Sequence, residues 1–189
     1  MGSGALCGRC AAQLRPAPDR YLAGAGVVRS AFVHEGVARI LVHHLKYRGV
    51  VAAGSLLAQE MAPLVPPDTV IVPVPRLRWR LLRYGVDPAL ELAAGVSRLT
   101  GQPLARLLRA PLMGRARAGR AHGTAPAFRP RAVPPGGIVL IDDVVTSGAT
   151  MTAAASVLGG VVAAVTATGA ASSLAGVTSL PPARQSVWR

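Results

Sequence analysis

Apolar residues in the first half of the chain follow two spacings, one typical of helices and one typical of strands. Segment 37–49, VARILVHHLKYRG, predicts an amphipathic helix that ends near Gly49. Its apolar residues at helical spacing are Val37, Ile40, Leu41 and Leu45. A second helix is predicted over 52–61, and the prolines that follow it end it. The β-branched run 69–75, TVIVPVP, is typical of a buried parallel strand.

The middle of the chain carries one further helix and then loses its periodicity. In 87–99, DPALELAAGVSRL, Asp87 is placed as an N-cap and Pro88 at the first helical position. An Arg-rich turn is expected before this helix, and a short strand over 103–109 after it. From 110 to 135 Gly, Pro, Arg and Ala follow no stable period, and we interpret this loop as a lid over anions rather than a linker.

Strand, helix and strand patterns then follow one another from 136 to 170. GGIVLIDDV and VVAAVTATGA are typical of buried strands, and ATMTAAASVL between them is predicted to be helical. This order implies a parallel sheet with right-handed crossovers. We therefore expect an α/β fold over 21–180, with a short appendage at 1–20 and a frayed tail at 181–189.

Composition changes this picture in two ways. Apolar residues make up 51% of the chain but aromatic residues only 4%, so the core must consist mostly of Ala, Val and Leu. The formal net charge of +13 favours an anionic partner, because such a field concentrates phosphates near the surface. The excess is almost entirely Arg, with Lys46 the only lysine, so a general composition bias remains an equal explanation.

The chain has no hydrophobic leader, and a cytoplasmic location is the default expectation. Segment 144–183 carries no charged side chain and would be long enough to span a bilayer. Its residues are mostly Ala, Gly, Thr and Ser, which insert weakly into membranes, so we predict no membrane span.

Cys7 and Cys10 form a Cys-x-x-Cys pair, which is half of a zinc site. Structural zinc takes four ligands, and the chain has no second cysteine pair. His34, His43 and His44 could complete a site, although their spacing does not indicate one. Two thiols without metal are therefore an equally good interpretation.

The candidate chemistry lies where the strand 138–141 ends. Asp142 and Asp143 follow it directly, and ligands of open α/β sheets bind at the carboxyl ends of strands. Two adjacent carboxylates repel each other, so their placement is costly unless a cation or hydroxyl donors share them. Mg²⁺ and the hydroxyls of a ribose would do both.

The turn that follows the acidic pair is typical of a phosphate site. It contains three hydroxyl side chains, a glycine at 148 and the amides of a helix N-terminus. A ligand with a vicinal diol and a terminal phosphate would satisfy both halves of the segment. A plain helix cap would leave the acidic pair unexplained. A Walker B strand is excluded because the chain has no GxxxxGK[ST] loop.

Segment 139–151, VLIDDVVTSGATM, resembles the phosphoribosyl pyrophosphate motif of type I phosphoribosyltransferases. The wider pattern resembles the ComF family of that group through its Cys-x-x-Cys start, HHLKYRG, VPVPRLRWRLLRYG and an Arg-rich loop that ends in AF. The resemblance covers nearly the whole chain. It implies a twisted parallel sheet flanked by helices, a flexible lid, and a small hood built from 20–36 and the C-terminal segment.

The resemblance also implies a role for each matching residue. Asp142 and Asp143 would contact the ribose hydroxyls and hold Mg²⁺, directly or through water. The residues expected around the 5′-phosphate are Val145, Thr146, Ser147, Gly148, Ala149 and Thr150. The residues expected on the pyrophosphate side are Lys46, Pro75, Arg76 and Arg83, and those expected in the lid are Arg115, Arg117 and Arg120.

Three departures from the family pattern leave the acceptor open. The chain has one cysteine pair where the family usually has two, and it reads GVDP at 85–88 where the family has Gly-Phe-Asn-Gln. Its lid also lacks the usual Gln and Asn.

The expected function is that of an Mg²⁺-dependent phosphoribosyltransferase, with two alternatives. One is a sensor that binds phosphoribosyl pyrophosphate without turning it over. The other, which the ComF resemblance implies, is an accessory of DNA uptake that binds single-stranded DNA. The few aromatic residues disfavour it, since single-strand binders usually stack bases on aromatic side chains.

Overall fold

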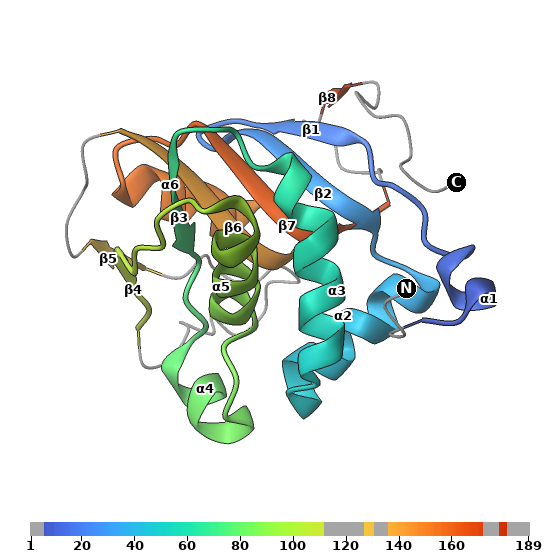
Figure 1. The fold of residues 1–189 in the computed structure, drawn as a ribbon. Coiled ribbons are helices and arrows are strands. Elements are labelled where there is room, and N and C mark those ends of the chain that lie inside the picture. The colour runs from blue at the N-terminus through green and yellow to red at the C-terminus, as the bar shows by residue number, and fades with distance from the viewer. Residues whose placement is uncertain (1–5, 112–126, 131–135, 172–177, 181–189) are drawn as a thin grey trace, which may run out of the picture.

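A central six-stranded sheet organises the protein (Figure 1). The structure is a computed structural model that describes residues 6–111, 127–130, 136–171 and the backbone of 178–180. The strands are β1 (Asp19–Leu22), β2 (Gly26–Val33), β3 (Thr69–Pro73), β6 (Gly137–Val145), β7 (Ala163–Gly169) and β8 (Thr178–Leu180). They lie in the order β3-β6-β7-β2-β1-β8. The first four pair in parallel, and β1 pairs antiparallel with β2 and β8.

Helices cover both faces of the sheet. The helices are α1 (Gly8–Ala11), α2 (Gly36–Arg48), α3 (Val51–Met61), α4 (Arg78–Tyr84), α5 (Pro88–Thr100) and α6 (Ala149–Val157), with a 3₁₀ turn, η1 (Ala62–Leu64). In Figure 1, α2, α3 and α5 lie in front of the sheet. Their buried side chains, such as Leu57 and Leu92, pack with Ile141 of β6. On the other face Met151 of α6 packs with Leu140.

The predicted α/β class is therefore confirmed: a mostly parallel sheet is flanked by helices. β7 is buried at every position, as the apolar run of the sequence predicts for a strand covered on both faces. Predicted helix limits also agree with the structure. Gly49 ends α2 in the left-handed conformation, and the Asp87 carboxylate accepts a hydrogen bond from the amide of Leu90.

The hood expected from 20–36 and the C-terminal segment agrees with the structure only in part, since β1 pairs with β8 but β2 does not belong to a hood. β2 lies inside this segment and pairs with β7 from Val27 to Val33, so it belongs to the central sheet. Arg29 and Ser30 interrupt its apolar run, which hides the strand from a periodicity argument. Within 20–36 it is β1 that departs from the parallel arrangement, because it runs antiparallel to both of its neighbours, β2 and β8.

Two shorter segments also differ from expectation. The Arg-rich turn before α5 is the helix α4, which Gly85 ends in the left-handed conformation. The strand expected over 103–109 is limited to a bridge between Leu104 and Ile71 and to the two-residue β4 (Leu108–Arg109), which pairs with β5 (Arg129–Pro130) in a separate sheet.

The appendage expected at 1–20 is attached to the sheet where it is described. The amide of Val33 donates to the carbonyl of Arg15 at 2.9 Å, and Leu14 packs against the core. The tail 181–189 lies outside the described residues. None of the helices in the described ranges has the length and apolar character that crossing a membrane requires.

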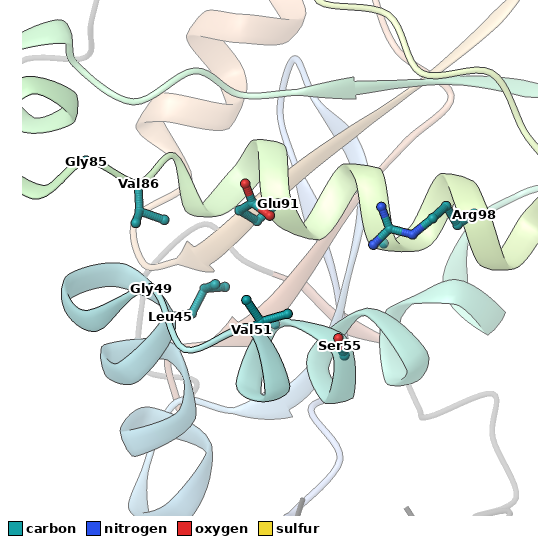
Figure 2. Close-up of a pocket in the computed structure, with 10 residues that line it drawn as sticks. Leu45, Gly49, Val51, Ser55, Gly85, Val86, Glu91 and Arg98 are labelled. Atoms are coloured by element: carbon teal, nitrogen blue, oxygen red, sulfur yellow. The ribbon is translucent and has the colours of Figure 1, made fainter.

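α3 and α5 pack closely at one point and leave a hollow beside it (Figure 2). The hollow has a volume of about 170 Å³ and does not include the acidic pair. Figure 2 shows Val51 and Ser55 of α3 on one side and Glu91 and Arg98 of α5 on the other. The close contact is at Gly95, where a Cβ atom would lie 2.6 Å from the Cβ of Ala58.

We expect Gly95→Ala to lower the free energy of unfolding by about 1–3 kcal/mol, because the two helices would have to separate. Helix propensity alone predicts the opposite, a gain of about 1 kcal/mol. Urea unfolding followed by circular dichroism would measure the change. The double variant Gly95→Ala with Ala58→Gly restores the space and should recover most of the loss, and stabilisation by the single variant would contradict the packing argument.

Candidate functional site

The acidic pair lies within β6 rather than after it. β6 continues to Val145, and Asp142 pairs in register with Thr166 of β7. On its other side β6 pairs with β3 only as far as Ile141. The amide of Val74, directly after β3, donates to the carbonyl of Ile141 at 2.9 Å. The carboxylates therefore lie at the point where the chain after β3 turns away from the sheet. This corrects the expectation that the strand ends at Ile141.

Asp143 is held by an ion pair with Lys46. The Lys46 Nζ atom lies 2.9 Å from Oδ2 and 3.2 Å from Oδ1 of Asp143. Asp143 is buried, and Lys46 comes from the last turn of α2. The structure thus joins two residues that the sequence separates by 97 positions.

No cation of the described residues pairs with Asp142 in this way. Adjacent residues of a strand point to opposite faces, so Asp142 lies on the face that α6 covers. Its Oδ1 atom accepts the amide of Asp143 at 2.8 Å. Burial, followed by the neighbouring charge of Asp143, raises the pKa of the Asp142 carboxyl well above its usual range, although that amide and Lys46 lower it. The ionised form therefore needs a cation or hydroxyl donors from a ligand.

His34 adds a proton-accepting group beside the pair. Its Nδ1 lies 2.8 Å from the hydroxyl of Thr168, and that hydroxyl donates to the carbonyl of Asp143 at 3.4 Å. This network assigns the proton to Nδ1 and leaves the lone pair of Nε2 available. Burial and then the charge of Lys46 lower the pKa of His34, whereas Asp143 raises it. Sequence reasoning considered His34 only as a zinc ligand, because no local pattern places it here.

The turn after β6 has the geometry expected of an anion site. Gly148 has a φ of 78° and is the N-cap of α6, while Thr146, Ser147 and Ala149 are exposed. The first amides of a helix have no carbonyl within the helix to bind, so they are available to a ligand. A Cβ atom at Gly148 would overlap the side chain of Leu22 in β1. This position therefore requires glycine for both backbone and space.

The remaining residues expected at the phosphate turn differ in their surroundings. Thr150 is partly buried in the first turn of α6. The side chain of Val145 packs in the core, so only its backbone can face a ligand.

Arg76 is joined to Lys46. Its Nη1 atom donates to the carbonyls of Lys46, at 2.9 Å, and of Val86, at 3.0 Å. Its guanidinium carbon lies 4.8 Å from the ring centroid of Tyr84. Nε and Nη2 are buried, and no described residue accepts a hydrogen bond from them. Arg76 therefore fixes the end of α2 and retains two donors.

The neighbours of Arg76 extend this arrangement. Pro75 precedes it in the same turn, and the amide of Arg76 donates to the carboxylate of Asp87 at 3.4 Å. Arg83 is exposed on α4, with its guanidinium carbon 5.6 Å from the ring centroid of Tyr84. The lid residues Arg115, Arg117 and Arg120 lie outside the described residues.

Cys7 and Cys10 are free thiols at α1. Hydrogen bonds from the backbone and from the side chain of Cys10 lower the pKa of Cys7. The contact between the two side chains raises the pKa of Cys10. Within the described ranges no third His, Cys, Asp or Glu joins them in a cluster that could hold a metal ion. The two interpretations of this pair, zinc binding and two thiols without metal, therefore both stay untested.

Comparisons with known proteins do not identify the site. No protein-family model matches the chain, and no curated protein sequence matches it. The arrangement of Asp142, Asp143, Lys46 and the turn that opens α6 is therefore the basis for a proposed function.

We expect Lys46→Met to lower the free energy of unfolding by roughly 1–3 kcal/mol, because it leaves the buried Asp143 carboxylate without its cation. Chemical denaturation would measure the change. Adding Asp143→Asn to the same chain should recover part of the loss, since the unpaired charge is then absent. A loss smaller than about 0.5 kcal/mol would show that solvent already screens the pair.

Proposed function

We propose that this chain binds phosphoribosyl pyrophosphate with Mg²⁺ and transfers its phosphoribosyl group to an acceptor. The observation that carries the proposal is the position of Asp142 and Asp143, at the end of a central parallel strand and directly before an exposed turn that opens α6. The resemblance to ComF-type phosphoribosyltransferases agrees with this arrangement.

The acidic pair would bind the ribose. Asp142 is ionised only at a cost in its present surroundings, and two ribose hydroxyls would donate hydrogen bonds that remove this cost. Carboxylate oxygens are also the ligands that Mg²⁺ prefers, so Asp142 and Asp143 would hold the ion directly or through water. When bound, Mg²⁺ would neutralise charge on the pyrophosphate group.

The turn after β6 would bind the 5′-phosphate. Thr146 and Ser147 are exposed and carry hydroxyl donors, and the helix that follows offers unpaired amides. Gly148 gives the turn the left-handed backbone that leads into α6. A ribose held by the acidic pair would carry its 5′-phosphate toward this turn.

In the proposed reaction a nitrogen of the acceptor forms a bond to C1′ of the ribose. The bond from C1′ to the pyrophosphate oxygen breaks, and its electron pair leaves on pyrophosphate. A proton on the attacking nitrogen passes to solvent or to Nε2 of His34. Lys46 and the free donors of Arg76 would stabilise the negative charge on the leaving group, with Arg83 adding positive charge nearby. The segment that contains Arg115, Arg117 and Arg120 would exclude water from the cationic carbon.

A sensor would use the same binding site without transfer, so a pyrophosphate-release assay separates it from the enzyme. Single-stranded DNA binding has one observation in its favour. α4 carries Arg78, Arg80 and Arg83 together with the exposed Trp79, and the Arg80 guanidinium lies 5.3 Å from the ring centroid of Trp79. A basic surface with an exposed aromatic ring suits bases and phosphates.

We expect Asp142→Asn to abolish binding of phosphoribosyl pyrophosphate with Mg²⁺, measured by calorimetry, while the folded state becomes more stable by about 0.5–2 kcal/mol. Both changes follow from removal of one partly buried charge that pairs with no cation of the described residues. Asp68→Asn is the matched control, because Asp68 is exposed and its positive φ suits Asn. The proposal would be refuted if the wild-type protein did not bind at millimolar ligand. It would also be refuted if Asp142→Asn bound as tightly as wild type.

We expect Arg80→Gln with Trp79→Ala to weaken any single-stranded DNA binding at least tenfold, since each stacked base is worth about 1–3 kcal/mol. The measurement is fluorescence anisotropy with a labelled oligonucleotide across a salt series. Asp142→Asn should leave this binding unchanged. No binding by wild type at low salt would remove the DNA alternative.

A further inference from the structure

Arg20 of β1 is a buried cation without an acidic partner among the described residues. Its side chain is 3% exposed, and no described residue accepts a hydrogen bond from its Nε or Nη2. Asp19, its acidic neighbour in sequence, pairs instead with Nε of Arg29 at 3.5 Å. A guanidinium keeps its proton in proteins, so a buried one requires an anion or several acceptors. Burial lowers the pKa of Arg20, as expected for a charge without compensation.

The guanidinium of Arg20 lies at the end of β7. A Cβ atom added to Gly169 would be 3.5 Å from Nη2 of Arg20 and 2.7 Å from the hydroxyl oxygen of Ser30. Gly169 therefore lets these two polar groups lie directly over the end of β7, where any larger residue would displace them. Gly169 also pairs with Val145, the residue at which β6 ends and the phosphate turn begins.

A row of polar side chains connects Arg20 to the acidic pair. Asp142, Thr166 and Ser30 are register partners across β6, β7 and β2. The hydroxyls of Thr166 and Ser30 are 2.8 Å apart, so they lie on the same face of the sheet. Arg20 pairs with Val28, two residues before Ser30, and lies on that face too.

The position of this row separates Arg20 from the pyrophosphate side. Lys46 reaches Asp143 from α2, on the opposite face of the sheet, and Arg76 binds the carbonyl of Lys46. Arg20 approaches from β1, at the other end of the strand order. Two residues further along β1, Leu22 packs against Gly148 of the phosphate turn. An anion at Arg20 is therefore distinct from the pyrophosphate.

We propose that Arg20 binds a carboxylate of the acceptor, so that the acceptor is a small nitrogen nucleophile bearing a carboxylate group. This inference rests on the proposed function and specifies its second substrate. Arg20 positions the acceptor through a charge-assisted hydrogen bond, which can be bidentate. Bond formation at C1′ remains as described above, and Arg20 takes no part in it.

The test compares acceptors that differ only in the carboxylate. Pyrophosphate release is measured with nicotinate and nicotinamide, with orotate and uracil, and with anthranilate and aniline. We expect turnover with a carboxylated member and at least tenfold less with its uncharged counterpart, because a hydrogen bond to a charged group is worth about 1.5–3 kcal/mol. Arg20→Gln should raise the KM of the carboxylated acceptor about tenfold or more, whereas Arg98→Gln, an exposed change on α5, should not.

Two further measurements separate the ways in which the inference can fail. Arg20→Gln should keep its affinity for phosphoribosyl pyrophosphate and ribose 5-phosphate within threefold of wild type. Loss of that affinity would assign Arg20 to the 5′-phosphate and overturn the inference. The inference would also be overturned if only uncharged acceptors were turned over, or if no acceptor of the panel was. Failure of wild type to bind phosphoribosyl pyrophosphate would instead refute the proposed function.

The stability of Arg20→Met provides a readout that does not depend on activity. Removal of a buried charge without a partner should raise the midpoint of thermal unfolding in the absence of ligand. A lower midpoint would show that Arg20 has a structural partner in the protein and would count against a ligand site.

Discussion

The alternation of side chains along a strand governs this site. Asp142 and Asp143 are neighbours in β6, and for that reason they serve opposite faces of the sheet. Asp143 faces α2 and pairs with Lys46, whereas Asp142 faces α6 and pairs with no cation of the described residues. The two carboxylates are therefore unequal. One is already neutralised by the protein and orders α2 relative to the sheet, and the other carries the charge that a ligand would satisfy in the proposed function.

Lys46 transmits this arrangement to the rest of the fold. Its ammonium group binds β6 while its carbonyl accepts Nη1 of Arg76, and the amide of Arg76 donates to Asp87 at the start of α5. A single chain of contacts thus fixes β6, α2, the turn after β3 and α5 relative to one another. Burial raises the pKa of Asp87, which is consistent with a cap that lies inside the protein rather than at its surface. The cations of the site are positioned before any ligand arrives.

Sequence reasoning succeeded where the relevant physics is local. Continuous apolar runs identified β6 and β7, and Asp87 with Pro88 identified the start of α5. It failed where the outcome depends on distant pairing. β2 is a central strand because β7 lies beside it, and its own interrupted apolar pattern does not reveal this. For the same reason no local pattern indicated that Arg20 is buried, or that His34 lies beside Thr168.

The charges around the acidic pair bear on how the proposed site would bind an anionic ligand. Lys46, Arg76 and Arg20 come from three different elements, and together with Asp142 and Asp143 they carry a net charge of about +1 if all five are ionised. The proposed ligand, phosphoribosyl pyrophosphate, would bring several negative charges into a region of low dielectric, where each uncompensated charge is costly. Three protein cations would not balance that ligand together with Asp142 and Asp143. In the proposed function a divalent metal or further arginines would have to complete the balance, which would give a physical reason for the arginine-rich composition of the chain.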